Sequence, residues 1–510
     1  MTFVRGLDPL GLQNTTEATF TVLLPGLNNV SRKIRYYPFY CWLLDLYGKE
    51  DRSLDPKSQR SFIRRAELIV ALVNQCLPKP SGEIPGTDYA VNWINGPVSD
   101  FDLEEGTYSA PNETEGTYWK NATGAFGQYY LGSMRDIGVI RDHPENTSIA
   151  ARTNLSDEFI SGEALAIAFQ ANLGEHDREV FLKAVKTGKV KRTELQLLTS
   201  GFDFSRPPEG TQEYVLLKKL LVQMDEPKMI EEPSKFRQRT IGYLLETAVS
   251  EPASIIRTFL SRAYQEKGGL PGNEDNTLIG WYYYQLNEYW QYTCLAILDG
   301  MLDILDELAP VSWYSLAALV DYTTEQVAKK LALRFDESLE NTVGHLMGNA
   351  AHLLEDDLHN EIREAYGADC IIPGLALIIL LKVKNEAYME RLSQFAVRYQ
   401  ASRDGDAVSF FLKMDRYFEL SIADWVREFI YTHILYRHQF VAFRKLGAGN
   451  LSTQLFLLEE GKIRLKNHFP PAPTSPRLAT LVGFLEDLGL LTQQKLTHSG
   501  EALRKELADA

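Results

Sequence analysis

The chain has few of the signals that identify enzymes. Its 510 residues include no glycine-rich phosphate loop, no Gly-x-Ser-x-Gly and no Cys/His cluster, the motifs of many nucleotide-binding, hydrolytic and zinc-dependent enzymes. The few cysteines are too widely spaced for a zinc motif or a disulfide framework; they are Cys41, Cys76, Cys294 and Cys370. We therefore expect reduced, mostly buried thiols, a protein without enzymatic activity, and no cofactor.

Long apolar runs are also missing. The most apolar stretch, Ile371–Leu381, is shorter than the roughly 20 residues that cross a bilayer, and it contains Pro373 and Gly374. Near the N-terminus, Arg5 and Asp8 interrupt the apolar run that a secretory signal needs. We expect a cytoplasmic protein without a membrane segment, in which Ile371–Leu381 is buried in a core.

Basic residues are fewer than acidic residues. The chain has 53 Lys and Arg against 68 Asp and Glu, a net charge of −15, so any contact with nucleic acid must be local. The 45% hydrophobic and 24% charged residues are typical of a soluble globular protein. The length allows roughly two to four domains.

The sequence does contain a repeated order of residue types. A helical pattern, a glycine followed by two apolar residues, a polar stretch, and the sequence Ser-Gly-Glu-Ala-Leu occur in this order twice. The first copy runs from Tyr130 to Leu165 and the second from Arg477 to Leu503. This order resembles the second half of a winged helix, in which a recognition helix is followed by a two-stranded wing and a closing helix. The alternative is two ordinary helix–turn–helix joints that share a short sequence by chance.

The residues at the joints favour the first interpretation. Gly138 and Gly489 follow the helices and suit a left-handed C-cap, because glycine has no Cβ to clash in that conformation. A Leu-Ser pair ending at Ser156 corresponds to the Leu-Thr pair ending at Thr497. We expect Thr497 to cap the last helix, and Asn154 or Ser156 to cap the closing helix of the first copy.

The rest of the chain has helical patterns. We expect a mainly α, multi-domain protein with two winged-helix-like modules whose wings are small β-hairpins. Residues 77–118 are rich in proline, glycine, serine and acids, which predicts a long, exposed acidic loop. The predicted division is an N-terminal helical region with this loop (1–118), a winged-helix-like module (119–174), a helical scaffold (175–446) and a C-terminal winged-helix-like module (447–510).

The segment Val30–Trp42 contains three cations and five aromatic residues close together. Such a segment can bind single-stranded nucleic acid, because cations neutralise phosphates and flat rings stack on bases. The alternative is a buried aromatic core in which the cations pair with acidic side chains. Across the chain, the candidate DNA- or partner-binding residues are Arg32, Lys33, Arg35, Tyr36, Arg135, Arg477, Lys495 and Arg504.

One helical segment carries the best candidates for a metal site: His345, His352, Asp356 and His359. Imidazole and carboxylate groups bind divalent metals, and the spacing places these residues near one face of a helix. His352 and His359 are two turns, about 10.5 Å, apart along a helix, so both reach one ion only if the helix breaks. We expect no metal here, and a solvated or interface pair of His352 and Asp356 instead.

The densest aromatic run, Trp281–Tyr292, would point its rings to all sides of a helix. We expect this helix to be enclosed on several sides; a stacking platform for bases or a ligand is the alternative. His433 and His438 lie near Arg437 and Arg444 in the sequence. We interpret this small basic patch as packing against helix ends rather than as a catalytic group.

Segments within the first 170 residues resemble known sequences; they are Leu24–Val30, Tyr36–Trp42, Phe62–Glu67 and Phe126–Tyr130. They look like segments of a set of bacterial proteins that resemble subunits found beside ATPases or nucleases in anti-phage defence operons. The resemblance implies a bacterial protein whose role depends on a partner.

Together, these observations predict a non-enzymatic helical scaffold or adaptor subunit of a bacterial complex, with an ATPase or a nuclease as its partner. Two winged-helix-like modules that frame a helical middle are also the general plan of bridging subunits that clasp ATPase heads. DNA is a further candidate partner, although the acidic chain favours a protein for at least one module. Two alternatives stay open: a metal-dependent hydrolase or nuclease that uses the His345–His359 region, and a winged-helix transcription regulator.

Overall fold

The computed structural model describes residues 8–50, 53–108, 110, 113–222, 233–269, 275–447 and 453–508. Helices hold 63% of the residues and strands 7%, which confirms the predicted mainly α fold. The chain divides into two compact units. Unit 1 comprises Met1–Val22 and Leu260–Thr474, and unit 2 comprises Leu23–Phe259 and Ser475–Ala510.

The two units cut across the predicted consecutive regions. The region predicted as a C-terminal module, 447–510, is divided after Thr474, so that only its last part belongs to unit 2. Both copies of the repeated pattern lie in unit 2. Each unit therefore combines segments that are distant in the sequence, an arrangement that local residue patterns do not reveal.

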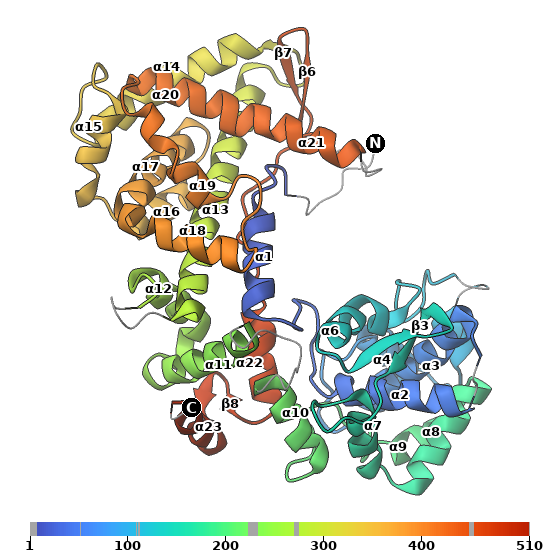
Figure 1. The fold of residues 1–510 in the computed structure, drawn as a ribbon. Coiled ribbons are helices and arrows are strands. Elements are labelled where there is room, and N and C mark those ends of the chain that lie inside the picture. Colours follow the sequence, from blue (N-terminus) through green and yellow to red (C-terminus); the bar gives the residue numbers. More distant parts are fainter. Residues whose placement is uncertain are drawn as a thin grey trace. The chain divides into compact units, whose positions relative to one another are not determined.

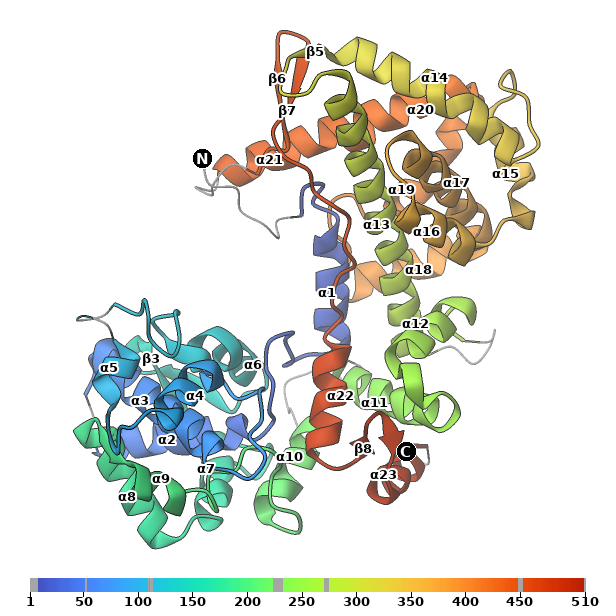
Figure 2. The ribbon, with the colours of Figure 1, turned by 180° about the vertical axis from the view of Figure 1, so that it is seen from behind.

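The long helix α13 (Asn276–Leu308) forms the core of unit 1. Among the helices that pack against it, as Figures 1 and 2 show, are α14 (Leu316–Arg334), α16 (Glu355–Glu364), α17 (Ala368–Asn385) and α18 (Met389–Arg398). The other helices of this unit are α1 (Gln13–Leu23), which ends at the unit boundary, α15 (Val343–Gly348), η3 (Ala350–His352), η4 (Glu386–Tyr388), α19 (Ala407–Phe411), η5 (Met414–Tyr417), α20 (Ile422–Glu428), η6 (Phe429–Tyr436) and α21 (Arg437–Gly447). Helix α12 (Ile255–Gln265) crosses the boundary between the units.

Burial around α13 and α17 confirms two predictions. Four consecutive aromatic residues of α13, Trp281–Tyr284, are each at most 1% exposed, so the helix is enclosed on all sides. The apolar stretch Ile371–Leu381 lies within α17 and is buried throughout, as expected of a core segment. Among the described residues, no helix is both long enough and apolar enough to cross a membrane.

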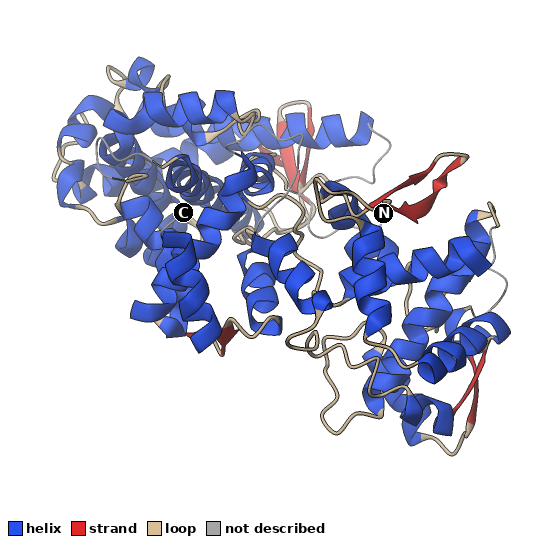
Figure 3. Cartoon of the chain, turned by 60° about the horizontal axis from the view of Figure 1, so that its bottom comes forward, coloured by secondary structure: helices blue, strands red, loops and turns tan. Residues whose placement is uncertain are grey.

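Strands are short and antiparallel, as the red segments in Figure 3 show. Unit 1 contains one three-stranded sheet in the order β5 (Tyr314–Ser315), β7 (Lys462–Leu465) and β6 (Phe456–Glu459). Unit 2 contains the pair β1 (Asp100–Asp102) with β4 (Lys189–Lys191), and two hairpins, β2 (Ile140–His143) with β3 (Asn146–Arg152) and β8 (Leu491–Thr492) with β9 (Lys495–Leu496).

Helix α2 (Tyr36–Glu50) is the core of unit 2. Every residue from Tyr36 to Leu44 is buried, and the rings around it come from Tyr130, Phe169, Phe181, Phe202 and Phe204. Pro38 lies in the first turn, where its missing N–H breaks no hydrogen bond within the helix. The aromatic residues of Val30–Trp42 therefore form a core, which is the second of the two interpretations given above.

The other helices of unit 2 are α3 (Pro56–Gln75), α4 (Thr87–Asn95), α5 (Leu103–Thr107), η1 (Phe126–Tyr130), α6 (Leu131–Asp136), α7 (Gly162–Ala171), α8 (Glu175–Thr187), α9 (Arg192–Leu197), α10 (Gln212–Val222), α11 (Pro233–Ser250), η2 (Pro252–Ser254), α22 (Leu478–Asp487) and α23 (His498–Ala508). The sequence predicts one long loop at residues 77–118. This prediction is wrong, because α4, β1 and α5 lie within the segment. Its few apolar residues pack inward: Trp93 stacks on Phe101 at 5.8 Å between ring centroids, and Phe101 faces Val190 across the β1–β4 pair.

Candidate functional site

The two copies of the repeated pattern form two helix–hairpin–helix modules in unit 2. Module 1 is η1–α6, β2–β3 and α7, and module 2 is α22, β8–β9 and α23. Gly138 and Gly489 end the first helix of each module with φ angles of 76° and 65°, so the predicted left-handed turns are confirmed. After each glycine, the next N–H donates back to the helix, at 3.1 Å in module 1 and 2.9 Å in module 2, which completes the usual glycine C-cap.

In module 2, Thr497 joins the end of the hairpin to both helices. Its Oγ1 lies 2.7 Å from the carbonyl oxygen of Gly489 and 3.1 Å from that of Leu490. The same hydroxyl accepts a hydrogen bond from the N–H of Gly500 at 3.0 Å. One side chain therefore caps α23 and ties it to the glycine turn, and the predicted cap role of Thr497 is confirmed.

In module 1, Thr153 makes the same three contacts. Its Oγ1 lies 3.0 Å from the carbonyl oxygen of Gly138 and 3.1 Å from that of Val139. The N–H of Gly162 donates to it at 2.8 Å. The two modules thus share one hydrogen-bond arrangement, although their loops differ in length.

The counterpart of Thr497 is therefore Thr153 and not Ser156, which corrects the alignment of the two copies. The glycine of Ser-Gly-Glu-Ala-Leu follows the threonine by nine residues in module 1 and by three in module 2. The expected caps of α7, Asn154 and Ser156, are also wrong. Because the longer loop separates Thr153 from α7, Ser161 caps that helix and accepts a backbone N–H at 3.2 Å.

The glycine of each Ser-Gly-Glu-Ala-Leu sequence is required by a close approach of two backbones. A Cβ at Gly500 would lie 2.1 Å from the carbonyl oxygen of Leu490, and one at Gly162 would lie 2.0 Å from that of Val139. No side chain fits within such distances. The glycine is therefore a packing requirement of one local structure that occurs twice.

The segment from Ser31 to Ile34 is held by both modules. Ser31 Oγ donates to a backbone carbonyl of η1 at 2.9 Å. On the other side, Asp487 at the end of α22 accepts the N–H of Ile34 at 3.0 Å and pairs with the ammonium of Lys33 at 2.9 Å. The predicted cationic segment is thus a link between the modules, and Lys33 is occupied by this link.

Two members of the predicted binding set are buried. Arg35 is 2% exposed and forms an ion pair with Glu213 at 2.8 Å. Tyr36 is fully buried among the rings of the unit 2 core. Neither side chain reaches the surface, so both are withdrawn from the predicted set. The sequence could not reveal this, because Glu213 lies 178 residues from Arg35.

The remaining residues of the predicted binding set differ in their exposure and in their ion pairs. Arg504 pairs with Glu246 at 2.6 Å and with Glu501 at 2.9 Å. Arg477 is half-buried at the start of α22, with a φ of 60°. The exposed members of the set are Arg32, Arg135, which pairs with Asp142, and Lys495.

A DNA-binding winged helix places its recognition helix in a groove of the DNA. In module 2, the corresponding helix is α22, and it is buried. Seven of the ten residues of α22 are buried, and only Ala479 is fully exposed. At the tip of the module's hairpin, Gln493 is exposed and Gln494 is half-buried. Both adopt positive φ, 48° and 61°, a conformation that costs a non-glycine residue about 1–2 kcal/mol.

The predicted histidine segment is not one helix. The short helix η3, which carries His352, separates α15 from α16. His352 is exposed, whereas the His359 ring packs against Tyr289 and Tyr292, with centroids 5.5 and 4.7 Å away. Asp356 accepts a hydrogen bond from the Tyr289 hydroxyl at 3.2 Å. Neither histidine belongs to the group of potential metal ligands that the described residues form.

That group lies elsewhere in unit 1. Potential ligand atoms of Asp299, Asp303 and His468 lie within 4.8 Å of one another. Burial raises the pKa of both carboxyls, and His468 Nδ1 lies 3.3 Å from Asp303. These residues could hold a divalent cation: His468 contacts Asp303 and, at 3.6 Å, Asp306, whereas the buried Oδ1 of Asp299 has no hydrogen-bond partner among the described residues. Spacing in the sequence could not reveal this group, because His468 is distant in the sequence from α13, which carries Asp299 and Asp303.

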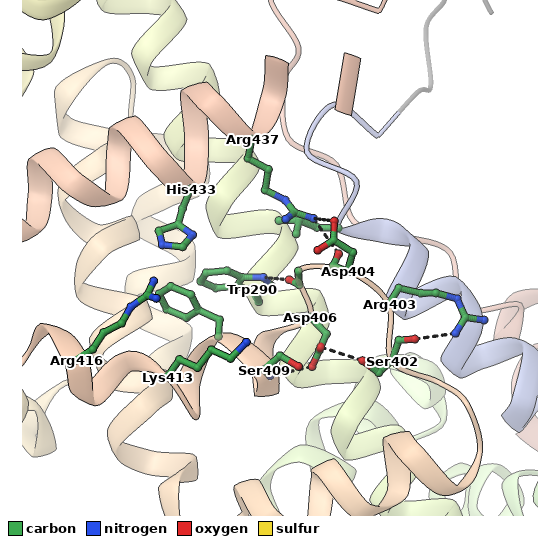
Figure 4. Close-up of a pocket in the computed structure, with 13 residues that line it drawn as sticks. Trp290, Ser402, Arg403, Asp404, Asp406, Ser409, Lys413, Arg416, His433 and Arg437 are labelled. Carbon is green, nitrogen blue, oxygen red and sulfur yellow. Dashed lines mark hydrogen bonds and ion pairs between the residues drawn. The ribbon is translucent and has the colours of Figure 1, made fainter. Parts of the chain in front are cut away.

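Unit 1 also contains a pocket of about 580 Å³. Figure 4 shows its side chains, which come from α13, the turn at 402–406, α19, η5, η6 and α21, together with Leu12 before α1 and Lys413 before η5. The lining residues are Leu12, Trp290, Ser402, Arg403, Asp404, Gly405, Asp406, Ser409, Phe410, Lys413, Arg416, His433 and Arg437. The sequence had linked only His433 and Arg437, because the other segments meet only in the folded chain.

Positive groups dominate this pocket. Four cations line it against two carboxylates, those of Asp404 and Asp406. Burial, reinforced by Arg416 and Arg437, lowers the pKa of His433 to about 4, so its imidazole is neutral at pH 7. In Figure 4, Arg416, His433 and Arg437 lie around Trp290, whereas Arg403 points away from them. The arrangement suits an anionic ligand rather than acid–base catalysis at neutral pH.

Comparison of the chain with protein-family models, with curated proteins and with solved structures found no match.

Proposed function

We propose that the protein is a non-enzymatic helical adaptor of a bacterial multi-protein complex with an anti-phage defence role. Its two modules are winged-helix-like, and they dock a partner protein, an ATPase or a nuclease. The observation that carries this proposal is the duplicated module: the same glycine turn, threonine contacts and glycine approach occur twice in unit 2. The resemblance to proteins of defence operons supplies the class of partner.

The exposed hairpin of module 2 is the docking surface that the structure favours. Gln493 and Gln494 occupy its two-residue turn with positive φ, where Asn-Gly is the usual sequence. Backbone strain of this kind concentrates at functional sites. Amide side chains and the exposed Lys495 beside them supply hydrogen-bond donors and acceptors for a partner surface.

Docking of a protein is favoured over reading of a DNA groove. Helix α22 is buried, so it cannot enter a major groove without leaving unit 2. Arg35 and Lys33 pair with Glu213 and Asp487, which removes two of the predicted phosphate contacts. With a net charge of −15, the chain as a whole repels nucleic acid.

The experiment is affinity purification of the tagged full-length chain from its native host, with and without nuclease treatment, read by mass spectrometry. We expect a stoichiometric ATPase or nuclease that remains bound after nuclease treatment. A chain that purifies alone, or a partner that is lost when nucleic acid is digested, would contradict direct protein docking.

A further inference from the structure

We propose that the pocket of unit 1 binds a small phosphate-bearing molecule of nucleotide size. The phosphate would lie against Lys413, Arg416 and Arg437, and the ring of the ligand against Phe410. The pocket uses no residue of either module, so this ligand would be additional to the docked partner. A volume of about 580 Å³ lies within the range of roughly 300–1,000 Å³ of small-molecule sites.

The cations of the pocket supply the groups that bind phosphate. Lys413 is exposed, and its side chain makes no hydrogen bond or ion pair with any other residue that the structure describes, so its ammonium is available. The guanidinium of Arg416 is exposed and lies over the Tyr417 ring at 4.6 Å. Arginine and lysine around one concave surface form charge-assisted hydrogen bonds with phosphate oxygens.

Arg437 is held in place by the turn that follows Arg403. Its Nε donates to the carbonyl of Leu10 at 2.7 Å, and its Nη2 donates to the carbonyl of Asp404 at 2.8 Å. Gly405 has a φ of 86°, and a Cβ there would lie 2.2 Å from Nη2 of Arg437. The left-handed φ favours glycine at this position, and the missing Cβ leaves room for the guanidinium. A cation fixed before binding loses little entropy when the ligand arrives.

An aromatic wall faces the same space. Trp290 is 3% exposed and donates its indole N–H to the carbonyl of Gly405 at 2.9 Å. Phe410 stacks on Trp290 with 4.5 Å between centroids and 27° between planes, and it is only half-buried. A flat ring supported from behind by a buried indole is a surface on which a base can stack.

The two carboxylates do not cancel this charge. Asp406 is 3% exposed and caps α19, accepting the N–H of Ser409 and the hydroxyl of Ser402, each at 3.0 Å. Its oxygens are therefore directed to α19 and to the turn. The Asp404 side chain is 64% exposed and lies 3.7 Å from Arg437, a distance at which water screens the pair. A phosphate can displace it.

The test is isothermal titration calorimetry of the full-length chain with ADP, pyrophosphate and adenosine. We expect ADP to bind one to one, pyrophosphate to bind more weakly, and adenosine not to bind. Lys413→Glu should weaken ADP binding by at least about tenfold, because it replaces an attraction with a repulsion. Lys329→Glu is the matched control: Lys329 is an exposed lysine of α14 outside the pocket, and ADP affinity should stay within about twofold.

A second variant tests the ring. Phe410→Leu keeps an apolar side chain but removes the flat face, so it should weaken ADP and leave pyrophosphate unchanged. Equal weakening of both ligands would overturn stacking on Phe410. Adenosine binding as tight as ADP binding would overturn phosphate recognition. The site would also be overturned by absence of binding for both anions, or by unchanged ADP affinity in a folded Lys413→Glu variant.

Discussion

The hydroxyl of Thr497 lies 2.7 Å from the carbonyl oxygen of Gly489 and joins the end of the β8–β9 hairpin to the turn that precedes it. Thr153 lies 3.0 Å from the carbonyl oxygen of Gly138 and joins the same points in module 1. One side chain in each module thus fixes the hairpin between two helices. Because the wing of module 2 is the proposed docking surface, its position depends on this hydrogen bond.

Removal of the Thr497 hydroxyl should loosen module 2. Thr497→Val keeps the shape of the side chain but loses its hydrogen bonds to Gly489 and Gly500. We expect a loss of about 1–2 kcal/mol in the free energy of unfolding of unit 2, measured by urea denaturation. Thr492→Val is the control, because Thr492 is exposed on the hairpin and should change stability by less than about 0.5 kcal/mol. Equal effects of the two variants would refute the role of Thr497.

Substitution of Gly500 should destabilise the module more strongly. In Gly500→Ala, the new methyl group would lie 2.1 Å from the carbonyl oxygen of Leu490, so the backbones must separate at a cost of roughly 1–3 kcal/mol. Gly483→Ala is the matched control, because nothing lies within 4 Å of a Cβ there and Gly483 is inside α22. That control should gain about 0.5–1 kcal/mol. If both variants shift the urea midpoint in the same direction, the close approach is absent.

A glycine in place of Gln494 should stabilise the turn of the β8–β9 hairpin. Gln494 has a φ of 61°, and Gln494→Gly relieves the cost of that conformation while keeping the backbone N–H that donates to Glu486 at 2.9 Å. We expect a gain of up to about 1 kcal/mol in thermal or urea unfolding, limited by the greater freedom of glycine in the unfolded chain. If the side chain of Gln494 contacts the partner, the same variant binds the partner less well. A variant that is destabilised would show that the turn is not strained.

Unit 1 should lose stability as the pH falls below neutrality. Burial lowers the pKa of His438 from 6.5 to about 4. In the folded chain its neutral ring donates to the carbonyl of Pro9 and accepts the N–H of Leu455, each at 3.0 Å. Folding therefore favours the unprotonated ring. The contribution of this residue is complete above about pH 6.5 and is lost as the pH falls toward 4. Urea midpoints at pH 7 and pH 5 should differ more for the wild type than for His438→Gln; an equal difference would contradict the buried neutral histidine.

The sequence predicted local features of the modules but not the contacts between distant segments. The left-handed turn at Gly489 and the cap at Thr497 follow from local rules for helix ends, so both were foreseen. The cap of α7 was misplaced, because no local signal distinguishes Ser156 from Ser161 when the loop is long. The pairing of Arg35 with Glu213 depends on a tertiary contact between residues 178 positions apart.

The pocket could not be predicted from the sequence for the same reason. Its cations come from the turn at 402–406, from Lys413 just before η5, from η5 and from α21, and its aromatic wall comes from α13 and α19. Each segment by itself has an ordinary helical pattern, and only the packing around α13 brings them together. Residues such as Lys413 and Gly405 therefore carry no recognisable signal in a single sequence.

The most direct measurement of the docking proposal is the amount of partner that the wing variant retains. The double variant Gln493→Glu, Lys495→Glu changes the exposed tip of module 2, and Lys57→Glu changes an exposed lysine of unit 2 outside both modules. We predict that the partner copurified from the native host falls by at least about tenfold in the wing variant and is unchanged in the control. Full retention of the partner by a folded wing variant would contradict docking through module 2.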